Sequence, residues 1–420
     1  MMNSESPAGA EVGTALDVNR LRKDFPALRR TVNGHPLVYF DNTAATLKPQ
    51  SVIDSISRVY SDYPANVHRG IHMLSEEATN AYEEARVKVA RFLNAREPDE
   101  IVYTLNTTDS INHIAGSWGE ANIGPGDEVL VTDMEHHANF VPWQQLCMRK
   151  GAKFQVAHVL SSGQLDREDF DSKLSERTKL VACAHVSNVS AVVNPIRELA
   201  EQAHRVGAIF VADCAQSVPH MPVDVQALGA DFIACSAYKF LAPFGVGILW
   251  GRRDLLDSMP PYRTGGNMIA EVSREHTRFN VAPHKFEAGT PSIADVIGMG
   301  AAIDYLEQWG MRAIYEHEVE LSRYMHERLA EMPGVRVIGD WFPGKPAIAS
   351  FHLDYAHPHD VAQFLNEEGV AVRSGLHCAE PLHCALGLSS STRASLYLYN
   401  THDEIDRMIA AIKTVEEIFA

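Results

Sequence analysis

The sequence is poor in basic charge, with 37 lysines and arginines against 54 aspartates and glutamates in 420 residues and a net charge of −17. A protein that binds nucleic acid without sequence preference needs a basic surface, so that class is excluded. No apolar run approaches the roughly 18 residues of a membrane-spanning helix, and the N-terminus has neither a signal-peptide nor a transit-peptide pattern. We therefore expect a cytoplasmic protein without a nucleic-acid or membrane partner.

Cysteine is also scarce, with six residues scattered along the chain. So few, at such irregular spacing, exclude the disulfide framework of a small secreted protein and predict reduced thiols. Cys147, Cys183 and Cys235 lie in apolar runs, where a free thiol packs much like a methyl group. Cys378 departs from this pattern, because it lies in the polar loop RSGLHCAEP.

The rest of the composition is that of an ordinary globular protein, at 45% hydrophobic and 22% charged residues. This is enough for a sizeable core divided over about two or three domains. Residues 1–18 are small and polar without an apolar period, which predicts a mobile leader. No repeat, low-complexity tract or long linker follows, so the domains should share a substantial interface.

Strand-like and helix-like segments alternate from residue 128 onward. Short apolar runs predict buried strands at 128–132, 153–159, 179–186, 208–213, 231–236 and 245–250. One of the intervening helices has Asn194 as its predicted N-cap, Pro195 at its first position and Gly207 at its end. This alternation is typical of a parallel sheet with crossover helices, in which ligands bind at the carboxyl ends of the strands.

The pattern changes after Gly266 to longer helices around 296–332, short strands and a C-terminal helix that begins with a capping box of Thr401 and Glu404. We therefore expect an α/β fold with a large domain around a mostly parallel mixed sheet and a smaller α+β C-terminal domain. The predicted limits are 35–280 for the large domain, and 19–34 together with 281–420 for the small one.

Two side chains at predicted strand ends have the chemistry that one cofactor requires. Lys239 follows an apolar strand, where partial desolvation disfavours its ammonium and makes it a nucleophile for Schiff bases. Asp213 ends the preceding strand and can pair with a pyridinium nitrogen. Either residue alone is more often a solvated or turn-forming side chain. Together they match the needs of a pyridoxal phosphate site.

Polar groups near other strand ends can complete such a site. Thr107 and Thr108 lie where a predicted helix begins, so their hydroxyls and backbone amides can bind a phosphate, unless they only cap the helix. His136 follows the strand at 128–132 and can stack on a cofactor ring, although a solvated histidine pair is the simpler interpretation. Each signal is weak by itself.

Nine segments, in order from about residue 39 to 401, resemble the class V aminotransferase-fold, pyridoxal-phosphate-dependent cysteine desulfurases. The segments are YFDNTAAT, ANVHRGIH, EHHANFVPW, HVSNVSAVVNP, DCAQ, SAYK, FEAGTP, RSGLHCAEPL and TRASLYLYNT. The similarity is greatest to the SufS-like group, which also includes selenocysteine lyases. It implies a fold type I pyridoxal-phosphate transferase and pyridoxal 5′-phosphate as the cofactor.

The resemblance assigns roles by position. It makes Lys239 the Schiff-base lysine, Asp213 the partner of the pyridine nitrogen and His136 the stacking, catalytic histidine. The other implied cofactor contacts are Thr107, Thr108, Gln216, Ser236 and Tyr238, with Thr290 from the other subunit of a homodimer. The implied substrate-binding residues are Asn42, Arg69, Asn188, Arg373 and Arg393. Arg393 suits this role, because a planar guanidinium pairs bidentately with a carboxylate.

The activity that the resemblance implies is the conversion of L-cysteine to L-alanine. Cys378 would attack the substrate sulfur and keep it as a persulfide for a SufE- or SufU-like acceptor in iron–sulfur cluster assembly or another thiolation route. The adjacent His377 and the nearby Arg373 favour a thiolate at this cysteine. The resemblance does not identify the acceptor.

Some positions depart from the family pattern. Tyr238 stands where histidine is usual, Cys214 and Ala242 where glycine is common, and Arg263 and Thr264 where apolar or glycine residues are common. A cation at a site entrance changes which substrate is admitted. The alternative is therefore a class V lyase, epimerase or transaminase for another amino acid, including a selenocysteine lyase or a cysteine sulfinate desulfinase.

A non-enzymatic alternative is a zinc-binding interaction protein. It uses four potential ligands: His377, Cys378, His383 and Cys384. Their spacing is not that of the usual zinc fingers or knuckles, so we expect no metal. A disulfide between the two cysteines would close a very short loop and require an oxidising compartment.

Overall fold

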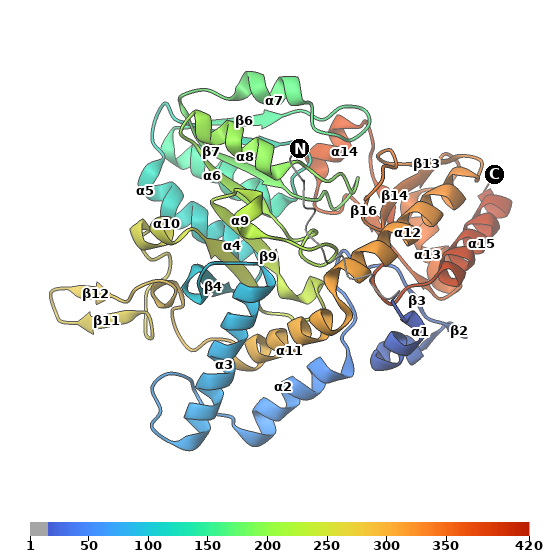
Figure 1. The fold of residues 1–420 in the computed structure, drawn as a ribbon. Coiled ribbons are helices and arrows are strands. Elements are labelled where there is room, and N and C mark those ends of the chain that lie inside the picture. The colour runs from blue at the N-terminus through green and yellow to red at the C-terminus, as the bar shows by residue number, and fades with distance from the viewer. Residues whose placement is uncertain (1–15, 420) are drawn as a thin grey trace, which may run out of the picture.

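The computed structural model describes residues 16–419 and shows two parts, each built around its own sheet (Figure 1). The expected mobile leader at 1–18 lies almost wholly outside the described residues, and helix α1 (Val18–Leu21) already includes its last position. Among the helices from residue 16 to 419, none has the length and apolar character needed to cross a bilayer.

The large part contains a seven-stranded sheet in the order β4-β10-β9-β8-β7-β5-β6. Its strands are β4 (Ile101–Thr104), β5 (Glu128–Thr132), β6 (Lys153–Ala157), β7 (Thr178–Ala184), β8 (Ile209–Asp213), β9 (Phe232–Ser236) and β10 (Gly247–Gly251). Only β10 pairs antiparallel with its neighbours, β4 and β9. The expected mostly parallel mixed sheet is therefore confirmed, and all six predicted strands are present.

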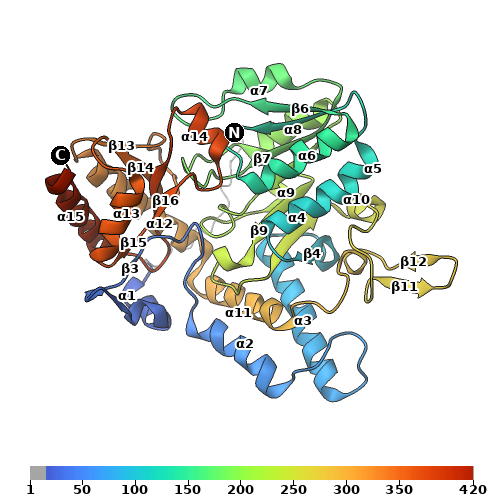
Figure 2. The same cartoon turned by 180° about the vertical axis from the view of Figure 1, so that it is seen from behind.

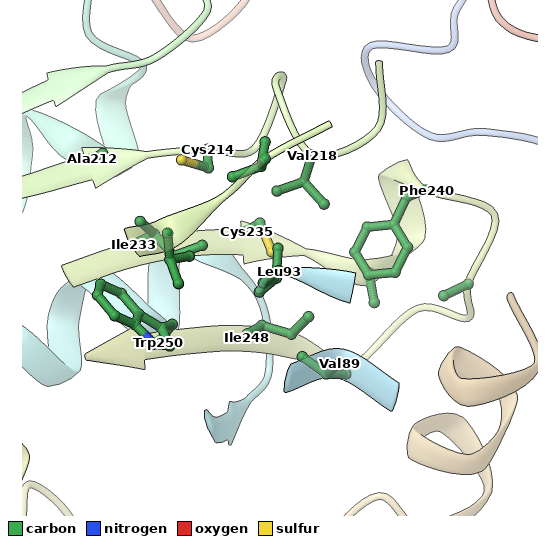
Figure 3. Close-up of a cluster of buried hydrophobic side chains, with 14 of the residues drawn as sticks. Val89, Leu93, Ala212, Cys214, Val218, Ile233, Cys235, Phe240, Ile248 and Trp250 are labelled. Atoms are coloured by element: carbon green, nitrogen blue, oxygen red, sulfur yellow. The ribbon is translucent and has the colours of Figure 1, made fainter. Parts of the chain in front are cut away.

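Successive strand residues point to opposite sides of this sheet, and the strands are apolar on both sides. Helices therefore cover both faces and bury them. One face packs against α3 (Met73–Phe92), α8 (Ile196–Arg205) and α11 (Ile293–Trp309). The other face packs against α4 (Thr107–Ile114), α6 (Val141–Lys150) and α10 (Arg253–Ser258). Figure 3 shows the first face, where Ile233 and Cys235 of β9 meet Ile248 and Trp250 of β10 and Val89 of α3.

Shorter or peripheral elements complete the large part. They are α2 (Gln50–Asp62), a π-helical turn (Ala115–Gly119), α5 (Glu120–Asn122), α7 (Arg167–Lys173), α9 (Val225–Leu228), β11 (Ile269–Val272) and β12 (Thr277–Phe279). The hairpin of β11 and β12 projects from the body in both views (Figure 1, Figure 2).

The start of α8 differs from the expectation. Pro195 is the N-cap, so the prediction that Asn194 caps this helix is wrong. Asn194 is buried, and its side-chain amide donates to the carbonyl of Ala184 at 2.7 Å. The carbonyl at the end of β7 is buried and needs a hydrogen-bond donor. Because the Asn194 side chain fills this need, it does not cap the helix.

The small part contains the antiparallel sheet β13-β14-β17-β16 and four helices. Its elements are α12 (Met311–Ala330), β13 (Val335–Val337), β14 (Ile348–Leu353), α13 (Pro358–Glu367), β15 (Val370–Ala371), β16 (Arg373–Gly375), α14 (Glu380–Ala385), β17 (Ser391–Ser395) and α15 (His402–Phe419). The capping box before α15 is confirmed: Thr401 N donates to Glu404 Oε2 at 3.1 Å, and Glu404 N donates to Thr401 Oγ1 at 3.4 Å.

Packing indicates how the chain divides between the two parts. Strands β1 (Thr31–Val32) and β2 (His35–Pro36) form a separate hairpin, and β3 (Val38–Tyr39) pairs in parallel with β15, which places Val38 and Phe40 in the core of the small part. Helix α11 instead contributes its buried side chains to the large core. We propose domain limits on this basis, with residues near 40 and near Gly310 as the crossing points instead of 35 and 280.

A buried ion pair ties α3 to the segment before α11. The guanidinium of Arg86 donates to both carboxylate oxygens of Glu287, at 2.8 and 2.9 Å, and both residues are buried. Replacing Glu287 with glutamine leaves a buried cation undercompensated, so we expect a loss of about 3 kcal/mol in the free energy of unfolding. Chemical denaturation measures this free energy. Glu84→Gln is the control, because Glu84 pairs with Lys88 at the surface, where an ion pair contributes little to stability. Equal losses in the two variants would contradict this.

Candidate active site

Five strands of the large sheet end at one edge, and the residues after them line a common cavity of about 440 Å³ that opens to solvent. The cavity lies where a parallel sheet places its ligands. Nine of the predicted site residues line it: Thr107, Thr108, His136, Asn188, Asp213, Gln216, Ser236, Tyr238 and Lys239.

Lys239 occupies a single 3₁₀ turn (Ala237–Lys239) that directly follows β9. Burial lowers the pKa of its amine to about 8, an effect that the nearby Asp213 opposes and Arg393 reinforces. The unprotonated amine is therefore much more accessible near neutral pH than in an ordinary lysine. An unprotonated lysine in a cavity is suited to nucleophilic attack on a carbonyl group and to proton transfer.

Two buried acceptors near Lys239 have capacity for a ligand. Asp213 is 5% exposed, and its Oδ1 accepts a hydrogen bond from the backbone of Ala215 at 2.9 Å. Gln216 donates through Nε2 to the carbonyl of Thr43 at 3.0 Å, and its buried Oε1 has no partner in the part of the chain that is described. An unpaired buried acceptor is costly, so these residues fit a cationic ring nitrogen and a ring hydroxyl of pyridoxal phosphate.

The opposite end of the cavity fits a phosphate. Helix α4 begins at Thr107, with Asn106 as its N-cap, so its first backbone amides face the cavity edge with the positive end of the helix dipole. Ser236 Oγ lies 2.8 Å from Thr107 N and 2.7 Å from Thr107 Oγ1. The helix start packs directly on Gly247 of β10, where a Cβ atom would lie 2.5 Å from the backbone of Asn106.

His136 follows β5 and lines the cavity together with Thr108 and Ala138. Its Nδ1 accepts a hydrogen bond from the backbone of Ala138 at 3.0 Å. Burial lowers the pKa of the ring to about 3, and the neighbouring Lys239 acts in the same direction. The imidazole is therefore neutral at physiological pH, which suits stacking on an aromatic ring.

Cys378 lies in the loop between β16 and α14, and the loop is bound to the large part at two points. The carbonyl of Cys378 accepts a hydrogen bond from His137 N at 2.7 Å, and the carbonyl of His377 accepts one from Asn188 Nδ2 at 2.8 Å. Both views place α14 between the two parts (Figure 1, Figure 2). The loop that carries the exposed Cys378 is thereby held beside Asn188, which lines the cavity, and beside the neighbour of His136.

The burial of the cysteines agrees with the sequence analysis. Cys147, Cys183 and Cys235 are buried as predicted, and Cys214 is buried too. Burial raises the pKa of Cys147 to about 11 and that of Cys214 to about 12, so both stay as thiols. Only Cys378 and Cys384 are exposed.

The histidines of the zinc alternative have other partners. His383 Nε2 lies 3.0 Å from Ser391 Oγ, and its Nδ1 lies 3.0 Å from the carbonyl of Ala379. His377 Nε2 contacts the same Ser391 at 3.1 Å. Within residues 16–419, the one group of three potential ligands that gathers in space is elsewhere, at His68, Glu83 and His284. The geometry gives no support to a zinc site around Cys378.

Two arginines and one aspartate lie beside the cysteine loop. Arg373 binds Asp41 through both carboxylate oxygens at 3.0 Å, and Arg393 NH2 lies 3.7 Å from the same aspartate. Arg393 is 2% exposed and donates to the carbonyl of Asn188 at 3.1 Å, and its buried Nε has no partner among residues 16–419. Sequence reasoning missed Asp41, although it precedes Asn42 in the segment YFDNTAAT.

The remaining predicted residues do not line the cavity. Asn42 is buried and bonds the carbonyl of Ser395 at 2.8 Å, whereas Arg69 is exposed before α3. Thr290 lines a second cavity of about 580 Å³. Arg263 lines that second cavity as well and pairs with Asp109.

Buried histidines predict a pH dependence of stability. Burial lowers the pKa of His185 to about 4 and that of His377 to about 2. The His377 ring is thus neutral, so the expectation that its charge favours a thiolate at Cys378 is wrong. The unfolded chain binds protons on these rings below about pH 6.5 while the folded protein does not, so acidification favours unfolding. We expect the cofactor-free protein to lose about 1–2 kcal/mol per histidine between pH 7 and 5, measured by urea denaturation.

The variant His185→Asn removes one of these rings. Its free energy of unfolding should fall less steeply between pH 7 and 5 than that of the parent protein. An unchanged slope would show that His185 does not titrate as described.

Comparisons with known proteins agree with this geometry. The profile of the family "Aminotransferase class-V" matches residues 38–408. A protein from Synechocystis sp. named probable cysteine desulfurase is 46% identical, over 95% of this chain and 96% of its own length. The cysteine desulfurase of Haloferax volcanii is 45% identical, over 96% of this chain and 98% of its own length.

Solved structures share the fold over nearly the whole chain. The cysteine desulfurase CsdA of Escherichia coli superimposes with a TM-score of 0.90 at 34% identity, covering 97% of this chain and 100% of its own. The apo cysteine desulfurase of Thermococcus onnurineus gives a TM-score of 0.91 at 37% identity, with the same coverage. These matches confirm the fold and the cofactor class expected from the sequence. The chain belongs to the class V aminotransferase family, in its group of pyridoxal-phosphate-dependent cysteine desulfurases.

Proposed function

We propose that this enzyme converts L-cysteine to L-alanine and keeps the sulfur as a persulfide on Cys378. One observation supports this most strongly: the loop of the exposed Cys378 is bound to Asn188, which lines the cavity that contains Lys239 and Asp213, and to His137, the neighbour of the cavity residue His136. A lyase or transaminase without a persulfide has no need for a thiol at this place. The relatives' names support the same activity.

The cavity residues divide by the part of the cofactor that they would hold. Thr107, Thr108 and Ser236 bind the phosphate, Asp213 and Gln216 bind the ring nitrogen and hydroxyl, and His136 stacks on the ring. Tyr238 offers a hydroxyl at the phosphate end, while its ring stacks on Phe244 at 5.4 Å. When bound, pyridoxal phosphate acts as an electron sink for the charge that develops at the substrate Cα.

The other residues orient the substrate and move its protons and sulfur. Arg393 and Asn188 hold the carboxylate, and Arg373 approaches it from the surface. The unprotonated amine of Lys239 takes the proton from Cα. The Cys378 thiolate then forms a bond to the substrate sulfur while the bond from that sulfur to Cβ breaks, and the electron pair of the broken bond stays with the carbon skeleton. Cβ takes a proton from solvent and Lys239 returns a proton to Cα, so that alanine is formed.

A homodimer explains the predicted residues that lie outside the cavity. Arg69 is followed by Ile71 and Met73, two strongly exposed apolar side chains that a second copy would cover. In such a dimer, Thr290 and Arg69 reach the partner's cavity. Sedimentation of the purified protein measures whether it is a dimer.

The acceptor of the persulfide is a second protein of the SufE or SufU kind.

Arg263, the cation that favours the alternative substrates, pairs with Asp109 and lines the second cavity together with Thr290. In the proposed dimer it would therefore lie near the partner's cavity. Alanine release from L-cysteine, L-selenocysteine and L-cysteine sulfinate compares the candidates directly. We expect L-cysteine to be consumed with formation of protein-bound persulfide. Faster release from the sulfinate, without persulfide from L-cysteine, would favour a desulfinase.

A further inference from the structure

The peptide bond that precedes Lys239 is held by an unusual number of donors. The carbonyl oxygen of Tyr238 accepts hydrogen bonds from Lys48 Nζ at 2.8 Å, Thr46 Oγ1 at 3.1 Å and Thr46 N at 3.2 Å. A carbonyl oxygen has two lone pairs, and here three donors, one of them a lysine amine, converge on it. The orientation of the peptide between Tyr238 and Lys239 is therefore tightly restricted.

The same segment also holds the far side of the lysine turn. Leu241 N donates to Thr46 Oγ1 at 2.9 Å, so one hydroxyl bonds on both sides of Lys239. Leu241 has a φ of 71°, in the left-handed region that branched and bulky residues rarely adopt. Such a conformation persists only where its surroundings fix it, and strain of this kind is concentrated at functional sites.

Lys48 has no counter-ion that would explain its position. It is largely buried, and no carboxylate lies within ion-pair distance of Nζ among residues 16–419. Its Nζ also donates to the carbonyl of Thr46 at 2.8 Å and lies 5.4 Å from the centre of the Phe244 ring, which stacks on Tyr238. Burying an unpaired cation costs stability, and burial lowers the pKa of this amine to about 7. Because this loss of stability is tolerated, we infer that Lys48 has a function at this position.

We propose that Lys48 is a positioning residue, which fixes the Tyr238 carbonyl so that the amine of Lys239 is aimed into the cavity. The proposal deepens the proposed function and rests on the role of Lys239 given there. Lys48 acts through the peptide and not on the substrate. Its loss should therefore affect the chemical step more than substrate binding.

The chain offers a matched control in a second buried lysine. Lys345 lies between β13 and β14, and its Nζ donates to the carbonyls of Gly339 and Asp340, both at 3.0 Å. It lines none of the cavities described above. Lys48→Met and Lys345→Met thus remove the same kind of interaction, at the active site and away from it.

The test compares cofactor-loaded Lys48→Met, Lys48→Arg and Lys345→Met with the parent protein. We expect Lys48→Met to lower kcat for L-cysteine about tenfold with KM within about twofold, because the hydrogen bond that orients the Tyr238 carbonyl is lost. The visible circular dichroism of the bound cofactor should weaken, since the turn that anchors it is loosened. Lys48→Arg should restore most of both signals, and Lys345→Met should retain them.

A kcat for Lys48→Met within about twofold of the parent value, or an equal loss in Lys345→Met, would overturn the proposal. If Lys48→Met does not fold, Lys48→Gln replaces it, with the same expected direction. A parent protein that binds the cofactor but makes no alanine from L-cysteine would instead refute the proposed function, so the two failures are distinguishable.

Discussion

Replacing Lys239 with alanine is expected to lower the turnover of L-cysteine by at least about a thousandfold. Lysine at this position provides both the nucleophile for the cofactor and the base for the substrate Cα proton, and each role alone contributes factors of about 10² to 10⁴. The variant should still bind pyridoxal phosphate through Asp213, Gln216 and the start of α4. Its visible absorption should be that of cofactor not joined to a lysine.

Two measurements check this expectation: alanine release, and the absorption spectrum before and after borohydride treatment. In the parent protein, reduction should attach the cofactor permanently to the peptide that contains Lys239. Lys345→Met is the control for the loss of a buried amine elsewhere, and it should keep both spectrum and activity. Substantial turnover by Lys239→Ala would remove the lysine from the proposed site.

Replacing Cys378 with serine should abolish persulfide formation and lower sulfur release by about a thousandfold, because a serine hydroxyl stays protonated and is a poor nucleophile toward sulfur. The cavity residues are unchanged, so the change in visible absorption on adding L-cysteine should remain. This combination separates the step at the thiol from the steps at Lys239.

Cys384 provides the matched control for this variant. It is exposed like Cys378 and lies six residues further along the chain, in α14. Cys384→Ser should keep persulfide formation and turnover near the parent values. Sulfur release by Cys378→Ser at the parent rate, or its loss in Cys384→Ser, would contradict the assignment of the thiol.

The cavity was predictable from the sequence because its residues directly follow short apolar runs, which are a clear signal for buried strands. Lys239 and Asp213 come directly after buried apolar runs, and parallel strands bring their carboxyl ends to one edge. Chain order and strand periodicity are local signals, so they predicted which side chains meet without any knowledge of distances. The exposure of Cys378 was predictable for the same reason, since its loop is polar while the runs around Cys183 and Cys235 are apolar.

Features that depend on long-range contacts were not predictable in this way. The sequence predicts that Asn194 caps a helix, but its side chain donates a hydrogen bond to the carbonyl of Ala184 instead. Nothing in the sequence around Lys48 indicates a special role, because its hydrogen bond to the carbonyl of Tyr238 forms only in the folded chain. Asp41 becomes important only because Arg373 and Arg393 reach it from the small part. The position of α11 on the large core is likewise a result of packing and not of local sequence.

The central claim is that Cys378 receives the sulfur of the substrate. Mass spectrometry of alkylated peptides, after mixing the cofactor-loaded protein with one equivalent of L-cysteine, tests it most directly. We expect one additional sulfur atom on the peptide that contains Cys378, formed together with alanine. Alanine formation with no additional sulfur on that peptide, or with the sulfur on Cys384, would contradict it.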